Sequence, residues 1–435
     1  MSSKTINISE FFKLGKKLFP ICRSLTGNGN RKTLRILKKK IFNLKKIEIP
    51  SGKKIFDWTV PPEWNIRSAY VEDENQNKII DFNKSNLHLV NYSIPISKNI
   101  FFKDLLKKLY FLKNQPNYIP YITSYYKKDW GFCVSYNYFK KLKKKYKYSS
   151  KFKVRINSTL NNKGSLSIGE ALIKGKSKKE IFISTYMCHP SICNDNLSGI
   201  LLTSMLYNYF KKKKNYYSIR FVFVPEIIGS ICYLNKRLKI LKKNFIAGYN
   251  LTCVGDTRAY SFLPSKNENS LTNKVAYKIF KENKISYKKY KYLDFRSDEG
   301  NYNSSGIDLE VATFCRSKYA EYKEYHTSGD NFNVLKKKGL KGSFNIMRKI
   351  IDDIMQTERP KCTVICEPQL GKRGLHPLIG TKESKKEVKK YINFLQYADG
   401  TNDIKKISEI LEIGTKECLR IYKKLYQNKL IKISK

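Results

Sequence analysis

Four short apolar segments in the middle of the chain constrain its fold most strongly. EIFISTYM (180–187) and SIRFVFVPE (218–226) are apolar runs of the length and type found in strands buried on both faces of a sheet. Between them, GILLTSMLYNYF (199–210) has the length and character of a buried helix. AGYNLTCVG (247–255) and LEVATFCRS (309–317) predict two further strands. This succession favours an α/β fold with a largely parallel sheet covered by helices.

The segments before and after this core divide the chain further. Residues 8–20, with Ser9 as the expected N-cap, and residues 31–44 carry helical spacing of apolar positions. KFKVRINSTL (151–160) and SLSIGEALIKG (165–175) are expected to pair as antiparallel strands, and residues 338–356 form a closing helix. Short aromatic, strand-like stretches occur between these parts: FDWTVPPEW (56–64), NLHLVNYSIPI (86–96) and DWGFCVSY (129–136).

The last part of the chain has a different pattern. CEPQLGKRGLHPLIG (366–380) is a connector rich in Gly and Pro. Three helical segments follow, at 384–398, 404–413 and 416–429, and then a short strand. This order is typical of a winged-helix module. We therefore expect three domains: an α/β domain (1–55 and 151–358), a β-rich insert (56–150), and a connector with a winged helix (359–435).

The composition constrains the class of protein less than the order of the apolar segments does. A hydrophobic fraction of 41% is enough to build packed cores, which excludes a disordered chain. The 86 Lys and Arg against 36 Asp and Glu give 86 − 36 = +50, a charge that attracts acidic polymers. The basic residues are spread along the whole chain together with many Asn, Ile and Tyr, so we interpret the charge as compositional background. Nucleic acid is not the partner that we expect.

Cysteine usage and hydropathy point to a compartment. The ten cysteines are scattered, and none stands in a C-x-x-C pair. The opening residues resemble an amphipathic helix and not a secretory signal, and no apolar run approaches the ~20 residues of a membrane span. We expect a cytoplasmic protein with reduced thiols and no membrane span.

Ionisable residues follow the apolar strands. His189 comes two residues after the end of the 180–187 segment, with Asp195 six residues later, and Glu226 ends the 218–226 segment. His326 lies in EYHTSGD (324–330). In open α/β sheets, ligand sites form outside the carboxyl ends of the strands, so these groups should meet although they are far apart in sequence.

Imidazole and carboxylate groups are the ligands that catalytic Zn²⁺ accepts, with one position left open. Such an ion lowers the pKa of water toward ~7 and polarises a carbonyl group. A carboxylate that does not bind the metal can pass the water's proton to a leaving amine, and Glu226 is our candidate for this role. The structural alternatives are a core or capping role for His189 and His326, an N-cap role for Asp195 and a salt bridge for Glu226.

Spaced motifs along nearly the whole chain resemble a known family. HPSICNDNLSG (189–199), PEIIGS (225–230), SDE (297–299) and EYHTSGD are similar to motifs of the bacterial aminopeptidase-like family associated with polysaccharide-biosynthesis genes. Further matches are CRSLTGNGNRKTL (22–34), FDWTVPPEWNI (56–66) and CEPQLGKRGL (366–375). The resemblance implies a zinc-exopeptidase-like, mostly parallel mixed sheet, an inserted β domain and a C-terminal winged helix.

The chain departs from the two-metal aminopeptidases that this family resembles. Those enzymes carry a second Glu where Ile227 follows Glu226, and a ligand Asp where Thr252 stands. Residue by residue, the resemblance leaves three metal ligands and so favours one zinc ion, with a second ion still open. The ligands are His189, Asp195 and His326.

Other residues of the motifs have secondary roles in this interpretation. Asp298 or Glu299 could supply a further ligand or bind a substrate amine, and Tyr325 could contact substrate. Asp330 is expected to orient His326. Arg23, Arg296 and Arg316 could line a pocket for an anionic group, or lie on the surface.

These observations predict a zinc-dependent aminopeptidase-like hydrolase. It would remove an N-terminal amino acid, or cleave a related amide, from a small peptide or amide substrate, with a link to surface-polysaccharide biosynthesis. Two alternatives stay open: a metal-binding scaffold without activity, and a regulator that binds nucleic acid through its winged helix. The insert or the winged helix could also carry a homo-oligomer contact.

Overall fold

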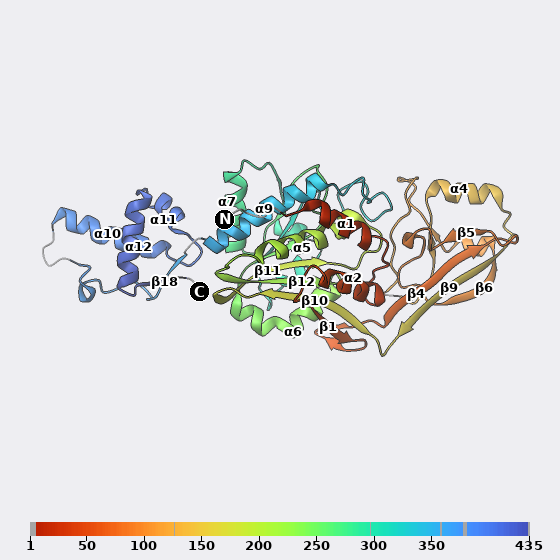
Figure 1. The fold of residues 1–435 in the computed structure, drawn as a ribbon, viewed down its shortest axis with the longest axis horizontal. Coiled ribbons are helices and arrows are strands. Elements are labelled where there is room, and N and C mark those ends of the chain that lie inside the picture. Colours follow the sequence, from red (N-terminus) through yellow and green to blue (C-terminus); the bar gives the residue numbers. More distant parts are fainter. Residues whose placement is uncertain (1–5, 126, 296, 357–358, 377–380, 434–435) are drawn as a thin grey trace. The chain divides into compact units, whose positions relative to one another are not determined.

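The computed structural model describes residues 6–125, 127–295, 297–356, 359–376 and 381–433. The chain forms two compact units, Met1–Lys349 and Ile350–Lys435. The larger unit contains the central α/β layers and the insert, and the smaller unit contains the C-terminal helices (Figure 1).

An eight-stranded sheet forms the centre of the larger unit. Its four middle strands, in the order β12-β11-β13-β16, run parallel to one another. At one side β10 and β1 continue it antiparallel, and at the other side β14 pairs antiparallel with β16 and parallel with β15. The predicted mixed, mostly parallel sheet is confirmed. In spatial order the strands are β1 (Lys45–Pro50), β10 (Ser165–Ile173), β12 (Tyr217–Val224), β11 (Ser177–Tyr186), β13 (Phe245–Leu251), β16 (Val311–Cys315), β14 (Ser261–Leu263) and β15 (Lys288–Lys289).

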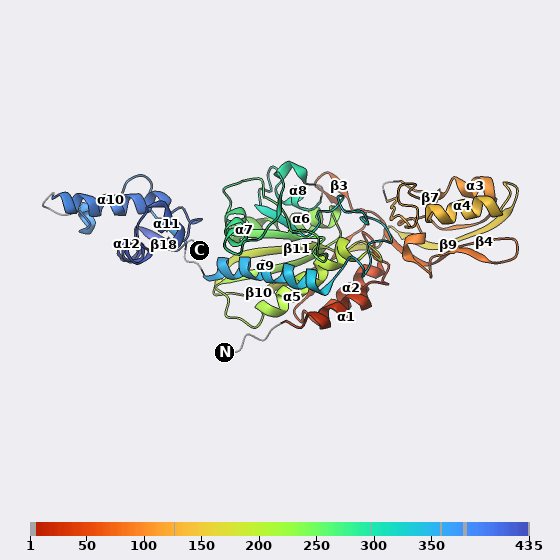
Figure 2. The same ribbon diagram turned by 90° about the horizontal axis from the view of Figure 1, so that it is seen from above.

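Helices cover both faces of this sheet, as its buried strands require. Figure 1 shows α6 below the sheet and α5 and α7 above it, so Figure 2, seen from above, looks onto the face that α5 and α7 cover. The ring contacts agree, since Phe280 of α7 packs on Phe314 of β16, whereas Tyr233 of α6 and Tyr302 of α8 pack on Phe182 of β11. The crossovers β11-α5-β12 and β12-α6-β13 are the units that the alternating sequence pattern predicted. The bounds are α1 (Ile8–Leu18), α2 (Asn28–Lys38), α5 (Ser198–Phe210), α6 (Ile228–Asn244), α7 (Leu271–Glu282) and α8 (Glu299–Tyr302), and α9 follows at Lys337–Gln356.

A buried ion-pair network crosses three strands of the sheet. The Arg220 guanidinium on β12 pairs with Glu180 of β11 through two nitrogens, at 2.6 and 2.8 Å. Its third nitrogen pairs with Glu170 of β10. Tyr233 and Arg237 of α6 also donate hydrogen bonds to Glu170, each at 2.7 Å. These contacts satisfy charges that would otherwise be costly inside a protein.

The insert has its own sheet and core. Four antiparallel strands, in the order β5-β4-β9-β6, pack with α3 and α4 around a cluster that includes Val71, Trp130 and Phe152 (Figure 1). Each of these three side chains is at most 7% exposed, so the insert has a complete apolar core. The bounds are β4 (Glu63–Glu72), β5 (Lys78–Asp81), β6 (Ile96–Phe101), α3 (Phe102–Leu106), β7 (Leu109–Tyr110), β8 (Phe132–Cys133), α4 (Tyr136–Lys145) and β9 (Lys151–Asn161), with β2 (Lys54–Ile55) and β3 (Trp58–Thr59) as a preceding hairpin.

Some local predictions for the first 175 residues are wrong. The strands β9 and β10 do not pair, because the short turn between them carries the chain from the insert's sheet to the central sheet. The alternating pattern of residues 86–96 predicted a strand, but residues 86–95 are a 3₁₀ turn (Asn86–His88) and a loop with isolated bridges, and only Ile96 belongs to a strand, β6. The N-cap of α1 is Asn7 and not Ser9, and α2 ends at Lys38 and not at residue 44.

The smaller unit is the predicted winged helix. Three helices pack around a core that includes Phe394, Ile407 and Ile421, and two short strands pair antiparallel beside them. None of the helices in the described part of the chain combines the length and hydrophobicity that a membrane span requires. The elements are β17 (Pro360–Cys362), a 3₁₀ turn (Gly371–Arg373), α10 (Lys382–Tyr397), α11 (Ile404–Ile410), α12 (Thr415–Gln427) and β18 (Ile431–Ile433).

Candidate metal centre

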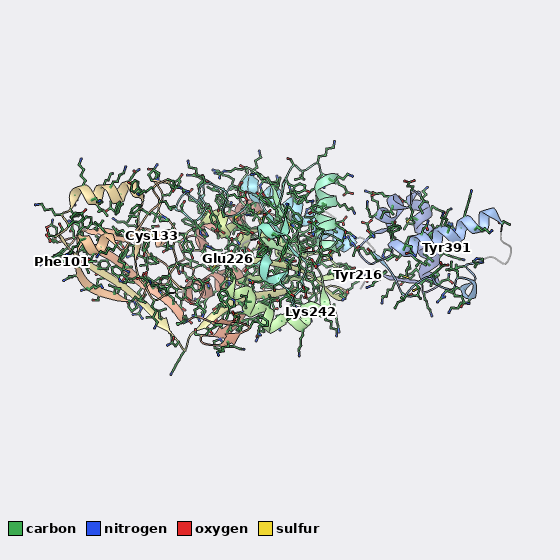
Figure 3. All side chains as sticks on the ribbon, turned by 180° about the vertical axis from the view of Figure 1, so that it is seen from behind. Phe101, Cys133, Tyr216, Glu226, Lys242 and Tyr391 are labelled. Carbon is green, nitrogen blue, oxygen red and sulfur yellow. The ribbon has the colours of Figure 1, made fainter. Side chains whose placement is uncertain are left out.

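The carboxyl ends of the parallel strands bring the predicted site residues together. His189 follows β11 and Glu226 follows β12, because the two strands run parallel and end at the same edge of the sheet. Figure 3 shows this direction: Tyr216, just before β12, lies on the side of the larger unit away from the insert, and Glu226 lies on the side near it. Asp195 comes from the turn before α5, and His326 from a loop after β16.

The three predicted ligands form one cluster. His326 Nε2 lies 3.0 Å from Asp195 Oδ2, and His189 Nε2 lies 3.8 Å from the same oxygen. One ligand atom from each of the three side chains lies within 4.8 Å of the other two. Ligand atoms on a tetrahedral zinc ion are roughly 3.3 Å apart, given bond lengths of about 2.0–2.1 Å. The three atoms therefore surround a space of the size that one such ion needs.

Unpaired atoms in the cluster also fit a cation. Asp195 Oδ2 and His326 Nε2 are buried and have no hydrogen-bond partner among the described residues. Buried polar atoms are usually paired, so two facing orphans indicate a missing ligand. The other oxygen of the carboxylate, Oδ1, accepts a short hydrogen bond from the Tyr186 hydroxyl, which also lies 2.7 Å from Thr252 Oγ1.

The protonation states suit metal binding. Burial lowers the pKa of His189 to about 4, against the opposing charge of Asp195, so this imidazole is neutral at pH 7. Burial alone would raise the pKa of Asp195, but the two imidazoles and the Tyr186 hydroxyl hold that pKa below its usual value. A neutral imidazole and an ionised carboxylate are the forms that coordinate zinc.

Asp330 supports the cluster in a different way from the predicted one. Its carboxylate accepts hydrogen bonds from the backbone N–H groups of Asn194 and Asp195, at 2.6 and 2.9 Å. The Tyr322 hydroxyl donates a third bond at 2.7 Å. We expected Asp330 to orient His326, but these bonds fix the backbone that carries Asp195.

Glu226 lies beside the cluster and is partly open to solvent. Its Oε2 is 3.8 Å from His189 Nε2, and its Oε1 accepts a hydrogen bond from Ser297 Oγ at 2.5 Å. The side chain is 20% exposed, whereas that of Asp195 is completely buried. Burial, together with the charges of Asp195 and Asp298, raises the pKa of Glu226 well above its usual value. A raised pKa makes this carboxylate a stronger base than an ordinary glutamate.

We expected Asp298 or Glu299 to supply a further ligand or to bind a substrate amine, and in the structure both side chains are buried and accept hydrogen bonds from neighbouring residues. Asp298 Oδ1 accepts bonds from Ile227 N and Ser230 Oγ, at 2.7 and 2.9 Å, and so fixes the first turn of α6. Ile227 has a φ of 61°, a conformation that is rare for a β-branched residue. Glu299 is 1% exposed and accepts bonds from side chains of β13 and β16.

Aromatic rings pack against the two histidines. One of these rings comes from the insert. Tyr325 stacks on His326 at a centroid distance of 3.9 Å. The Tyr121 ring lies 5.1 Å from His189 and 5.3 Å from His326, edge-on to both. The backbone holds Tyr121 there, because its N–H donates to His326 O at 2.8 Å. Tyr121 is not among the predicted site residues, because no motif near the predicted ligands marks it.

The same insert loop pairs with the His326 loop over several residues. Ser328 N donates to Ile119 O at 2.8 Å, and Ile119 N donates to Ser328 Oγ at 2.9 Å. Pro120 and Thr327 form an isolated antiparallel bridge. The insert is thus part of the wall of the candidate site.

Two of the three arginines named above, Arg23 and Arg316, contact other residues of the larger unit. Arg23 is fully buried and donates from Nε to His189 O at 3.0 Å and from Nη1 to Leu18 O at 2.6 Å. Burial lowers the pKa of Arg23 to about 10, and the bonds show that it anchors the backbone of His189. The Arg316 guanidinium lies 3.6 Å from the centre of the Tyr260 ring. Arg296 lies outside the described residues.

Cys188 forms a second potential ligand group with His189 and Glu226. Its Sγ lies 3.6 Å from His189 Nδ1 and accepts a hydrogen bond from Glu226 N at 3.3 Å. Burial raises the pKa of Cys188 well above its usual value, so the thiol stays protonated and is a poor ligand. The cluster around Asp195 Oδ2 is therefore the better cation site.

Comparisons with known proteins agree with this arrangement. Residues 12–357 match the family described as "Domain of unknown function (DUF4910)", and residues 358–433 match a winged helix-turn-helix family. A protein of Clostridium acetobutylicum, the "Putative polysaccharide biosynthesis protein with aminopeptidase-like domain", is 41% identical over 376 residues, which are 85% of this chain and 84% of that protein.

Solved structures show the same similarity. The crystal structure of a "putative peptidase" from Clostridium acetobutylicum is 37% identical, covers 98% of this chain and 96% of its own, and has a TM-score of 0.80. BSAP, a zinc aminopeptidase from Bacillus subtilis, is 12% identical and covers 80% of this chain and 94% of its own. Its TM-score of 0.57 shows a shared fold. The chain therefore belongs to the DUF4910 family, with a domain of aminopeptidase-like fold followed by a winged helix.

Proposed function

We propose that this protein is a metal-dependent amide hydrolase of the aminopeptidase type, with one zinc ion held by His189, Asp195 and His326. The observation that carries the proposal is the pair of buried, unpartnered atoms, Asp195 Oδ2 and His326 Nε2, that face each other at 3.0 Å beside His189. A divalent cation between these atoms satisfies both of them.

The surroundings of Asp195 favour one ion over two. A carboxylate that bridges two metal ions uses both oxygens, but here the Tyr186 hydroxyl occupies Oδ1. Thr252 and Ile227 also stand where the resemblance predicts further carboxylate ligands for a second ion. Thr252 Oγ1 contacts the Tyr186 hydroxyl, so this position belongs to a neutral hydroxyl cluster.

The residues around the cluster suit the hydrolysis of an amide. A bound zinc ion supplies Lewis acidity, which lowers the pKa of water and polarises an amide carbonyl. Glu226 accepts the proton of the attacking water on Oε2, since Ser297 binds Oε1 and holds the carboxyl group in place. The same group then delivers the proton to the leaving nitrogen. Tyr121 packs against His189 and Tyr325 against His326.

The substrate class follows from the fold and the relatives. Aminopeptidase-like chemistry predicts a substrate with an N-terminal amino acid or a related amide. The name of the Clostridium acetobutylicum relative connects that protein with polysaccharide biosynthesis. We therefore propose an aminoacylated or N-acylated sugar, or a small peptide, as the substrate.

Glu226→Gln tests the catalytic assignment. We expect the purified variant to bind one zinc ion per chain, like the natural protein, and to lose at least about 100-fold of its activity, because general acid–base groups contribute about that much. Asp195→Asn should lose the metal as well. Zinc content by atomic emission and the release of p-nitroaniline from aminoacyl p-nitroanilides measure the two effects. Glu412→Gln, at an exposed position of the smaller unit, is the matched control.

A metal-binding scaffold without activity is the second candidate. The replacement of two expected carboxylate ligands by Ile227 and Thr252 favours it. Zinc binding by the natural protein without hydrolysis of any p-nitroanilide or N-acetylated amino sugar would support the scaffold. Failure to bind zinc, with Asp195 intact, contradicts both functions.

A further inference from the structure

A cavity of about 470 Å³ lies where the insert meets the α/β layers of the larger unit. Most of its wall comes from the segment WTVPP (58–62), which the catalytic proposal leaves unexplained. Tyr125 of the insert and Ile228 of α6 also line it. The volume falls within the range of about 300–1,000 Å³ that is usual for small-molecule sites.

Two chain segments connect this cavity with the candidate metal centre. One insert loop carries Tyr121, which contacts both histidines, and four residues later Tyr125, which lines the cavity. The start of α6 carries Ile228 in the cavity, two residues after Glu226. Ile228 N also donates to Glu226 O at 2.8 Å. Two short stretches of chain therefore link the wall of the cavity to the proposed reaction centre.

The chemistry of the lining selects an uncharged ligand. None of the lining residues is charged, in a chain whose formal net charge is +50. Trp58 and Tyr125 offer aromatic rings, and Pro61 and Pro62 offer flat apolar surfaces. The exposed residues Thr59 and Asn162 supply polar groups at the edge. Such a lining favours a ring that stacks through an apolar face and keeps its polar groups near the rim.

We propose that this cavity is a substrate subsite for an uncharged ring, joined to the amide that lies at the metal centre. The proposal rests on the proposed function and adds the class of group that the enzyme recognises. Two sources share the required chemistry: the pyranose ring of a neutral sugar and the aromatic side chain of an amino acid. Because the binding of the ring does not require turnover, it can be measured separately from hydrolysis.

The position of Trp58 makes a direct binding test available. The chain has three tryptophans, of which Trp64 and Trp130 are 2% and 7% exposed, while Trp58 is half-buried in the cavity wall. A ligand in the cavity should therefore change mainly the fluorescence of Trp58. The titrations use the Glu226→Gln protein, so that no probe is consumed. The probes are methyl N-acetyl-β-glucosaminide, phenylalaninamide and, as a control without a ring, alaninamide.

We expect a saturable fluorescence change with the glucosaminide or with phenylalaninamide, and none with alaninamide. Which ring binds identifies the source. Trp58→Phe should abolish the signal, and Tyr125→Ala should raise the Kd about fivefold, because an aromatic contact contributes about 1 kcal/mol. Phe56 is an exposed aromatic residue of the same hairpin and does not line the cavity. Phe56→Ala should therefore change neither the fluorescence signal nor the Kd.

If neither ring binds saturably, the proposal is overturned, even if the protein hydrolyses amides. A signal that persists in Trp58→Phe, or a Kd that Tyr125→Ala leaves unchanged, overturns it as well. Binding of a ring by a protein without hydrolytic activity would support the subsite and contradict only the proposed reaction.

Discussion

Asp195 is the residue on which the candidate site depends, because its two oxygens have different surroundings. Oδ1 is held by the Tyr186 hydroxyl, whereas Oδ2 lies 3.0 Å from His326 Nε2 and 3.8 Å from His189 Nε2. Asp330 holds the Asp195 backbone at the same time. A carboxylate fixed in this way is already oriented for a cation, which lowers the cost of binding one.

Tyr121 should position the two histidine ligands. Because its ring lies edge-on to both imidazoles, Tyr121→Ala leaves them free to rotate, and we expect metal affinity to fall roughly tenfold, as for other supporting residues of metal sites. Tyr121→Phe keeps the ring and should change the affinity less than about twofold. Titration with Co²⁺, followed by its visible absorption, measures both the affinity and the geometry of the site.

Tyr148→Ala, at a tyrosine of the insert that is 61% exposed, is the matched control for this experiment. It should bind Co²⁺ like the natural protein. If Tyr121→Ala also binds Co²⁺ with unchanged affinity and an unchanged spectrum, the insert does not position the ligands. The role of Tyr121 would then be limited to packing.

The sequence allowed the main residues of the cluster to be predicted, because one rule of the fold applies to them. His189 and Glu226 follow buried parallel strands, and such strand ends must meet. Tyr121 could not be predicted, since it reaches His326 across 326 − 121 = 205 residues and is one of 31 tyrosines. The carboxylates of Asp298 and Glu299 stand in a recognisable motif, but a motif does not show whether a side chain is buried.

Elements of the central sheet were more predictable than those of the insert. Strands such as β11 and β12 are buried on both faces, so their apolar runs are unambiguous. Residues 86–96 alternate in sequence like a strand, but residues 89–93 are all buried in a loop, so this alternation does not mark one buried side. The pairing of β9 with β4 and β6 depends on contacts that are distant in sequence, and a short turn before β10 wrongly suggested a hairpin.

Arg220 should be essential for the stability of the central sheet. Arg220→Met leaves Glu180 without its bidentate partner and removes one of the charges around Glu170, and both carboxylates are at most 6% exposed. We expect the free energy of unfolding to fall by about 3–5 kcal/mol, the usual cost of breaking a buried ion pair. Urea denaturation followed by circular dichroism measures this change.

Arg237→Met is the matched control for Arg220→Met, because Arg237 also pairs with Glu170 but its side chain is 27% exposed. We expect a loss of about 1 kcal/mol or less for this variant. Equal losses for the two variants would show that burial does not decide the strength of this network.

The whole molecule consists of two units with separate cores. The clusters around the central sheet and in the insert lie within the larger unit, and the cluster around Phe394 lies within the smaller one. All candidate ligands belong to the larger unit. A ligand that binds only folded protein stabilises the unit that holds it, so the location of the metal has a consequence for the unfolding of the full chain.

Calorimetry of the full chain should show two unfolding transitions, of which zinc raises only the one with the larger enthalpy. At a free zinc concentration 100 times the Kd, zinc raises the free energy of unfolding of the larger unit by about 2.7 kcal/mol. The stability of the winged helix does not change, because the candidate ligands lie in the other unit. The larger enthalpy identifies the larger unit, since unfolding enthalpy scales with the number of residues. His326→Ala removes one of the three ligands and should abolish the shift while leaving two transitions in place. A shift of the smaller transition alone, or an equal shift in His326→Ala, would mean that zinc binds elsewhere than at the cluster around Asp195.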